Sequence, residues 1–191
     1  MRKMVSVLGL VLLLGLSAEV ACAQATGQKS DPAKAKPSAS QVVLEQWNDI
    51  GRKLIAMSED FSEDKYDFKP VQGVRSFAEQ LLHASASMYY FTDPAQGQKP
   101  RYPDDPKRDE LKTKAQIVAF VKKCVEDGAA MIKTKGDKGL GEWITSPESK
   151  QQLQVSDLAY GLIEHSGEHY GQLVVYYRVA GLVPPESRPK K

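Results

Sequence analysis

Apolar residues recur at intervals of three and four in four stretches of the chain, which is the period of an amphipathic helix. The first stretch predicts a helix with six large side chains on one stripe: Val43, Trp47, Ile50, Leu54, Met57 and Phe61. The second opens with Ser76-Phe77-Ala78-Glu79, in which the serine and glutamate can form a capping box. We expect this helix to end at about Phe91, ahead of Asp93-Pro94, and to be buried on most sides.

The third and fourth stretches also carry start and stop signals. The third begins with a capping box at Thr113-Lys114-Ala115-Gln116, and Gly136 and Gly139 close it. The fourth begins near Ser156-Asp157 and ends at about Ala180, before a glycine and a pair of prolines. Its core stripe contains two histidines among apolar residues: Leu158, Leu162, His165, His169, Leu173, Tyr176 and Ala180.

These patterns predict an all-α fold, a four-helix bundle. No alternation is long enough to build a sheet, and no internal repeat or glycine-rich phosphate loop is present in the sequence. Two connections, 92–112 and 135–155, exceed the two to eight residues that are typical between bundle helices. A connection of about 20 residues can span over 60 Å, so either could cross the whole bundle. Charges alternate in sign over 104–114, which indicates a solvated loop and the start of a helix.

The N-terminus has the pattern of a secretory signal peptide. Two cationic residues precede an apolar run over 5–16, and small residues follow at 21–23. The run falls short of the roughly 20 residues that a membrane helix needs, so we expect no permanent membrane span. We expect cleavage near Ala23 and export to the periplasm or the exterior. Cys22 does not indicate a lipoprotein, because Glu19 occupies the position where that signal has leucine.

The expected organisation is therefore a signal peptide (1–23), a small, polar and flexible leader (24–40), the bundle (41–185) and a C-terminal tail (186–191). After cleavage one cysteine remains, Cys124, which we expect to be a buried hydrophobe rather than a nucleophile. The 26 Lys+Arg against 24 Asp+Glu leave a net charge of +2, which argues against a nucleic-acid partner.

The candidate chemistry lies in the three histidines of the sequence, His83, His165 and His169. The i, i+4 spacing of the last two places both imidazoles on one helical face, about 6 Å apart along the axis, which suits two ligands of one divalent metal ion. Buried imidazoles without partners would cost roughly 1–3 kcal/mol each, so coordination would explain their place on an apolar stripe. Histidines that only hydrogen-bond a carboxylate or carbonyl remain an equal alternative from spacing alone.

Polar residues surround the pair within one helical turn. Glu164 and Glu168 are candidate bases by proximity, although either could equally orient a ligand or face solvent, and Gln172 is a further neighbour. No residue is assigned a catalytic role.

The sequence resembles the DinB/YfiT-like family, and exported members in particular. The residues that carry the resemblance are GVRSFAEQLLHASAS (73–87), HSGEHYGQLVVYYRVAGLVPP (165–185) and the link EDFSEDKYDFKP (59–70). The family pairs one histidine on the second helix with His-x-x-x-His on the fourth, followed by a Gly-Gln-Leu step and a terminal Arg-x-x-Gly-Pro region. The resemblance spans about 42–185.

This resemblance implies a four-helix bundle whose second-to-third connection crosses over. It also implies a divalent metal ion held by His83, His165 and His169, with the remaining positions open. Zinc is the favoured ion, with nickel, iron and manganese as alternatives. Some members are S-transferases or isomerases that use small cytosolic thiols, a cosubstrate not expected for an exported protein.

Three hypotheses follow. The first is an exported metal-dependent hydrolase or transferase that acts on a small molecule of unidentified class. The second is a non-catalytic metal-binding or interaction bundle. In the third, the histidines are only polar groups of the core. The oligomeric state is left open, with a homodimer as one option.

Overall fold

The computed structural model describes residues 36–189, so the expected signal peptide (1–23) and most of the expected leader lie outside the described residues. The secondary structure consists of α1 (Ala39–Asp60), α2 (Phe77–Ala86), α3 (Tyr89–Ala95), α4 (Lys114–Leu140), β1 (Trp143–Thr145), β2 (Gln152–Gln154) and α5 (Val155–Val179), with short 3₁₀ turns at Glu63–Lys65 and Pro185–Ser187. Within 36–189, no helix combines the length and the apolar character needed to cross a membrane.

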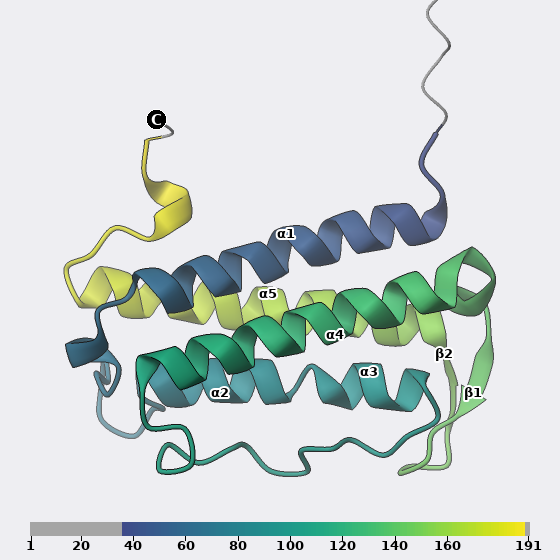
Figure 1. The fold of residues 1–191 in the computed structure, drawn as a ribbon, viewed down its shortest axis with the longest axis horizontal. Helices are drawn as coiled ribbons and strands as arrows, with labels where there is room; N and C mark the ends of the chain where they lie inside the picture. Colours follow the sequence, from purple (N-terminus) through teal and green to yellow (C-terminus); the bar gives the residue numbers. More distant parts are fainter. Residues whose placement is uncertain (1–35, 190–191) are drawn as a thin grey trace, which may run out of the picture. The chain divides into compact units, whose positions relative to one another are not determined.

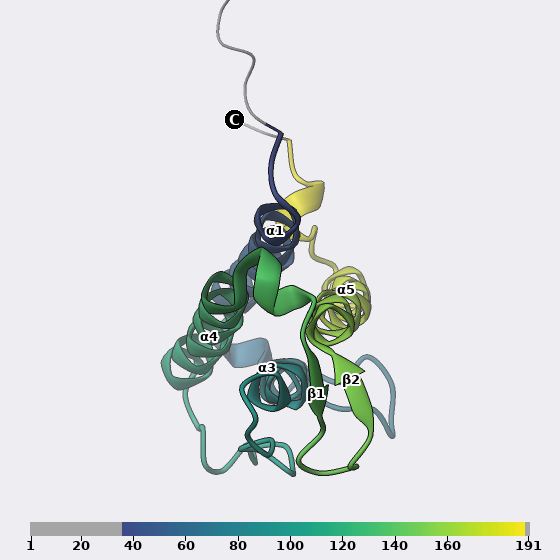
Figure 2. The same cartoon turned by 90° about the vertical axis from the view of Figure 1, so that its right-hand side faces the viewer.

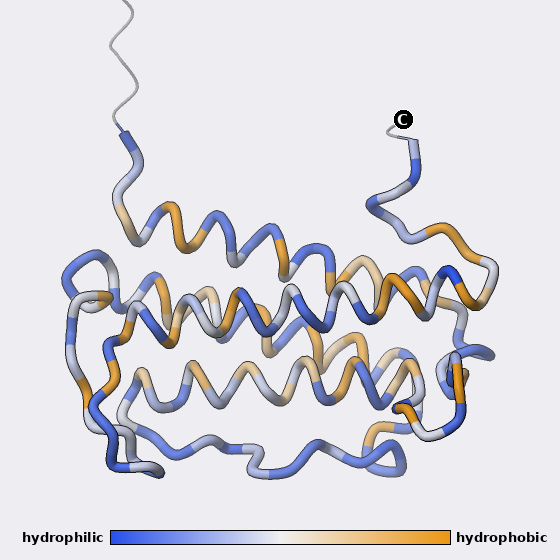
Figure 3. Tube along the Cα trace, turned by 180° about the vertical axis from the view of Figure 1, so that it is seen from behind, coloured by the Kyte–Doolittle hydropathy of each residue, from blue (hydrophilic) through white to orange (hydrophobic). Residues whose placement is uncertain are grey.

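The helices form a four-helix bundle, as predicted (Figure 1). Helices α2 and α3 lie end to end and together make the second helix of the bundle (Figure 1). This helix and α4 run in the same direction, so the connection over 96–113 travels back along the length of the bundle, which confirms the crossover (Figure 1). The connection is mostly hydrophilic, whereas apolar positions recur regularly along the helices (Figure 3).

The predicted helix starts are confirmed by their capping geometry. Ser76 accepts a hydrogen bond from the backbone N–H of Glu79, and Thr113 accepts one from that of Gln116. In both cases the side chain of the third residue reaches back to the N-cap backbone. Each capping box satisfies N–H groups that have no partner inside the helix.

The second helix differs from its predicted form. It breaks at Ser87 and Met88, where the Ser87 hydroxyl donates to the carbonyl of His83 over 2.7 Å, and it resumes as α3. It also continues to Ala95 rather than ending at about Phe91. Pro94 is tolerated because it lies in the last turn, so little helix follows the backbone hydrogen bond that proline cannot donate. Phe91 is therefore inside a helix that faces α5.

The expectation that the chain forms no sheet is also wrong. Strands β1 and β2 pair in antiparallel register, with Ile144 opposite Leu153, and this hairpin lies at one end of the bundle (Figure 2). Strands of three residues are too short to show alternation in the sequence. The predicted stop of the third helix is confirmed: the helix kinks at Gly136, which has a φ of 56°, and its last turn ends at Leu140, one residue after Gly139.

The core joins all four helices. Trp47 of α1 is fully buried and donates from Nε1 to the carbonyl of Val125 in α4 over 3.0 Å. Phe61 stacks on Phe77 with ring centroids 3.8 Å apart, and Tyr177 of α5 packs edge-on against Phe61 at 4.9 Å. Cys124 is buried and free, as predicted.

The crossover connection is attached to the bundle by a buried carboxylate. Asp93 is 0% exposed and accepts three hydrogen bonds from Arg101, from Nη2 at 2.6 Å, from Nε at 3.0 Å and from the backbone N–H at 2.9 Å. The Arg101 guanidinium lies over the ring of Tyr89 at 4.1 Å. Such charge-assisted bonds are stronger than neutral ones and hold the start of the connection against the second helix.

The contact between Trp47 and Gly128 predicts a clear effect of substitution. A Cβ atom at Gly128 would lie 2.6 Å from the Trp47 ring, so we expect Gly128→Ala to lower the free energy of unfolding by about 1–3 kcal/mol. Gly171 has no atom within 4 Å of the corresponding position, so Gly171→Ala should be neutral or stabilising by up to about 1 kcal/mol. Urea denaturation followed by circular dichroism compares the two variants, and equal stabilities would contradict the packing described.

Candidate metal centre

The structure brings the three predicted histidines together. His83 comes from α2, His165 and His169 come from α5, and one nitrogen from each lies within 4.8 Å of the other two. The ring centroid of His169 lies 4.3 Å from that of His165 and 4.7 Å from that of His83. His169 is buried, while the side chains of His83 and His165 are 21% and 26% exposed, so solvent reaches one side of the cluster.

The donor set fits a transition-metal ion. The Nε2 atoms of His165 and His169 face each other at 3.1 Å, and two nitrogens at about 2.0–2.1 Å from a tetrahedral ion stand about 3.4 Å apart. Neutral imidazole nitrogens are the ligands that zinc, nickel and iron accept readily. The residues present could therefore hold one divalent ion.

A pair of glutamines determines how His169 presents its nitrogens. The His169 Nδ1 lies 2.6 Å from the side-chain amide of Gln80 and 3.1 Å from that of Gln172, and the two amides bond each other at 2.6 Å. Gln80 Nε2 donates to Gln172 Oε1, which is the amide oxygen that faces Nδ1. In the tautomer whose Nδ1 carries the hydrogen, Nδ1 donates to this oxygen and the lone pair of Nε2 faces the other histidines.

His83 is oriented in the same way by a carboxylate. Both carboxylate oxygens of Asp105 lie 2.9 Å from His83 Nδ1, which donates to them, so the neutral ring has its lone pair on Nε2. Arg75 bonds the same carboxylate over 3.3 Å. Asp105 belongs to the crossover connection and is exposed, as expected for 104–114, but its contact with a histidine of the site was not expected. The tertiary fold brings this loop alongside α2.

The acidic residues singled out beside the histidines take a smaller part. Glu168 is the nearer, with its carboxylate 3.9 Å from His165 Nδ1 and its side chain 60% exposed. Glu164 is exposed. Gln172 does touch the site, through His169. On the other side of His165 the ring of Phe91 lies at a centroid distance of 5.7 Å.

Burial and mutual repulsion keep two of the imidazoles neutral. Burial, followed by the proximity of His165, lowers the pKa of His169 to about 4. The pKa of His165 is also lowered, first by burial and then by His83. Neutral imidazole is the form that binds metal ions.

Three contributors to the site, Gln80, Arg75 and Asp105, were not predicted. Gln80 carried a usable signal in the sequence, because it is a polar residue on a nearly apolar helix, one turn before His83. In the structure Gln80 is 3% exposed. Arg75 and Asp105 carried none, since each lies outside a helix at a position that only the folded loops define.

Comparison with known proteins agrees with this fold and this arrangement of helices. Residues 46–173 match the model of the DinB superfamily. The chain belongs to the DinB superfamily. No curated protein sequence matches it. This DinB protein is similar in fold to a DinB-like protein from Bacillus subtilis, YjoA, with 18% identity, a TM-score of 0.61 and coverage of 78% of this chain and 99% of that one.

Two other solved structures show the same fold. A DinB-like protein from Bacillus cereus has 18% identity and a TM-score of 0.62 over 75% of this chain and 93% of its own. The third is described as "YfiT from Bacillus subtilis is a probable metal-dependent hydrolase with an unusual four-helix bundle topology", with 16% identity and a TM-score of 0.57 over 80% of this chain and 94% of that one.

The lowered pKa of His169 predicts a pH dependence of stability for the metal-free protein. In the unfolded chain this imidazole takes up a proton near pH 6.5, whereas in the folded chain it resists protonation until about pH 4. The unfolded state then binds more protons in this window, so the free energy of unfolding should fall as pH falls from 6.5 toward 4, by on the order of 1 kcal/mol.

Urea denaturation in the presence of a chelator, at pH 7 and pH 5, measures this loss, which should be smaller in His169→Gln. The carboxylates of Asp60 and Asp127, whose pKa values are lowered from 3.8 by their cationic neighbours, titrate below the window. An equal loss in the variant and the wild type would contradict the assignment.

Proposed function

We propose that this DinB protein binds one divalent metal ion through His83, His165 and His169 and that it is a metal-dependent hydrolase or transferase. The observation that carries the proposal is the convergence of three imidazole nitrogens from two helices within 4.8 Å. The description of the structurally similar YfiT as a "probable metal-dependent hydrolase" supports the reaction class. Zinc is the favoured ion, because a set of three nitrogen donors suits zinc, nickel or iron better than manganese, which prefers oxygen.

The neighbours of the histidines are arranged to orient them. With the hydrogen on His169 Nδ1, Gln172 Oε1 accepts it over 3.1 Å, and Asp105 accepts that of His83 Nδ1 over 2.9 Å. Hydrogen bonds of this kind fix the tautomer and raise the basicity of the nitrogen that binds the metal. Both rings are thereby held with Nε2 directed into the cluster.

The exposure of His83 and His165 favours a site that a substrate can reach. A divalent ion held by three imidazoles polarises a carbonyl or a bound water and lowers the pKa of that water toward neutral. Asp105 is committed to His83 and Arg75, so Glu168 is the acidic group best placed to accept or return a proton at this site. The cationic and apolar pattern of 1–23 supports an exported protein.

Metal content is the first test. Purified wild-type protein should bind one equivalent of zinc in calorimetric titration, and zinc should raise the melting temperature, because an ion that binds only the folded state adds to its stability. His169→Ala should lower the affinity at least 100-fold, whereas Glu164→Gln on the exposed face of α5 should leave it unchanged. A melting temperature insensitive to both zinc and chelator would contradict the proposal. It would favour the hypothesis that the histidines are only polar groups of the core.

The role of Gln80 gives a second test. Gln80→Leu should reduce zinc affinity by about 10- to 100-fold, because Gln172 Oε1 loses the donor that holds it against His169 Nδ1 and the ring loses its orientation. Gln80→Glu should restore most of the affinity, since a carboxylate can accept from Nδ1–H directly. The control is Gln151→Leu in the hairpin turn, an exposed position. If Gln80→Leu and the control bind zinc equally well, Gln80 does not position His169.

A further inference from the structure

The three histidines of the cluster differ in how their Nδ1 atoms are held. That of His169 lies against the glutamine pair, and that of His83 lies against the carboxylate of Asp105. Within 36–189, no group hydrogen-bonds the Nδ1 of His165, and the carboxylate of Glu168 stands 3.9 Å from it, beyond hydrogen-bond distance. His165 is therefore the histidine whose ring has no hydrogen-bonded neighbour outside the cluster to orient it.

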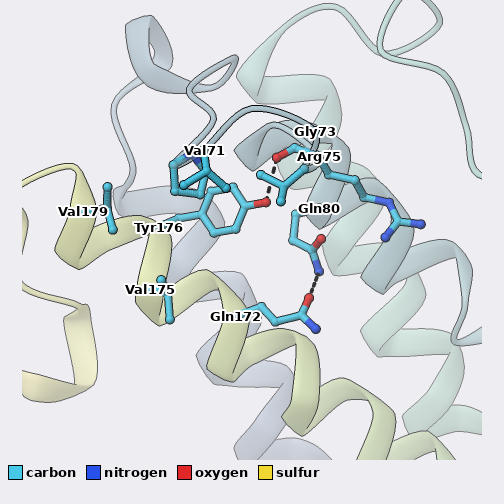
Figure 4. A pocket seen from close by; sticks show the side chains of 10 residues that line it. Val71, Gly73, Arg75, Gln80, Gln172, Val175, Tyr176 and Val179 are labelled. Atoms are coloured by element: carbon cyan, nitrogen blue, oxygen red, sulfur yellow. Dashed lines mark hydrogen bonds between the residues drawn. The ribbon is translucent and has the colours of Figure 1, made fainter.

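The glutamine pair also separates the cluster from an apolar pocket. The pocket has a volume of about 710 Å³ and is lined chiefly by the loop over 70–75 and by apolar side chains of α5 (Figure 4). The amides of Gln80 and Gln172, which line this pocket, point toward each other and contact His169 Nδ1 (Figure 4). The pocket thus adjoins the outer side of His169, and it contributes nothing to the position of His165.

Apolar support for His165 comes from α3. The ring of Phe91 lies at a centroid distance of 5.7 Å from the His165 ring, with an angle of 49° between the two planes. This separation is typical of packed aromatic rings. Both side chains are half-buried, so the contact is partly removed from water. The Phe91 ring therefore limits how far the imidazole can turn.

Gly161 provides the space that Phe91 occupies. It lies on α5 one turn before His165, and the side chains of a helix lean toward its N-terminus, so the His165 ring lies over this turn. A Cβ atom at Gly161 would stand 2.6 Å from Cε1 and 3.0 Å from Cδ1 of Phe91. Because glycine has no side chain, the Phe91 ring can reach the backbone of α5 beside the imidazole.

We propose that Phe91 is the positioning residue of His165 and that it orients the imidazole by packing, in the space that Gly161 leaves. This inference rests on the proposed metal site and adds a residue to the groups that orient its ligands. The centre then has three kinds of support: an amide pair for His169, a carboxylate for His83 and an aromatic ring for His165. Loss of a group that orients a ligand typically weakens metal binding about 10- to 100-fold.

Zinc titration of two alanine variants tests the proposal. Phe91→Ala should bind zinc about 10-fold more weakly than the wild type, or weaker still. Phe120→Ala is the matched control, because Phe120 on α4 is also half-buried but packs against Tyr102, with ring centroids 5.5 Å apart, instead of a histidine. Both truncations should lower the melting temperature, whereas only Phe91→Ala should lose zinc affinity. Circular dichroism confirms that each variant is folded at the temperature of the titration.

Two further measurements distinguish positioning from a general loss of packing. The visible absorption of Co²⁺ bound in place of zinc reports the geometry of its ligands, and it should change in Phe91→Ala but not in Phe120→Ala. Phe91→Leu, which keeps an apolar side chain against Gly161, should restore most of the zinc affinity and the cobalt spectrum.

Gly161→Ala tests the same contact without removing the ring. The added methyl group must displace Phe91, so zinc affinity should fall about 10-fold. In a Phe91→Ala background the same substitution should change little, because no ring remains to be displaced. Gly171→Ala is the control, since it meets no atom within 4 Å.

The outcomes separate this inference from the proposed function. Wild-type zinc affinity in Phe91→Ala, or an equal loss from Gly161→Ala with and without the Phe91 ring, would overturn the positioning role while the metal site stands. Failure of the wild-type protein to bind zinc would instead overturn the proposed function and this inference with it.

Discussion

The packing of α2 against α5 determines where the three histidines and the two glutamines of the candidate site lie. At one end of this contact Phe77 of α2 packs edge-on against Tyr177 of α5 with ring centroids 6.0 Å apart, and Phe61, directly after α1, stacks on Phe77. One turn further along α2 the Gln80 amide bonds Gln172 across the two helices at 2.6 Å. His83 follows on α2, opposite His169. The aromatic cluster thus sets the register in which one histidine of α2 meets two of α5.

Burial is what makes this register chemically useful. An imidazole removed from water disfavours its protonated form, and the lowered pKa of His169 reflects this. The same burial would be costly if the ring nitrogens had no partners, and the glutamine pair meets that cost on the Nδ1 side. The other nitrogens face one another across a space that three imidazole donors share, which is an arrangement typical of a metal site.

The crossover connection links the fold to the site. A connection between two parallel helices must travel the length of the bundle, and here it passes alongside α2 and α3 (Figure 1). Asp93 and Arg101 hold its start, and Asp105 within it reaches His83. The long segment is therefore a structural part of the candidate centre, which a short loop between antiparallel helices could not supply.

Much of this architecture could be predicted. The spacing of apolar residues predicted the four helices of the bundle, and the capping boxes placed two of their starts, because both are local properties with a fixed period or a fixed offset. The pairing of His165 with His169 follows from the geometry of a single helix in the same way. The break at Ser87 and the hairpin were not predicted, since each depends on contacts with other elements.

The sequence by itself therefore determined the helical class of the fold and placed two histidines on one face of α5. It also named His83, on the second helix, as the third candidate ligand. Only the tertiary structure decided that Gln80, Asp105 and Arg75 join them and that an apolar pocket adjoins the site. The physical reason is the range of the interactions. Helix periodicity and capping act over three or four residues, whereas Asp105 lies 22 residues from His83 and Gln80 lies 89 residues from His169 in the chain.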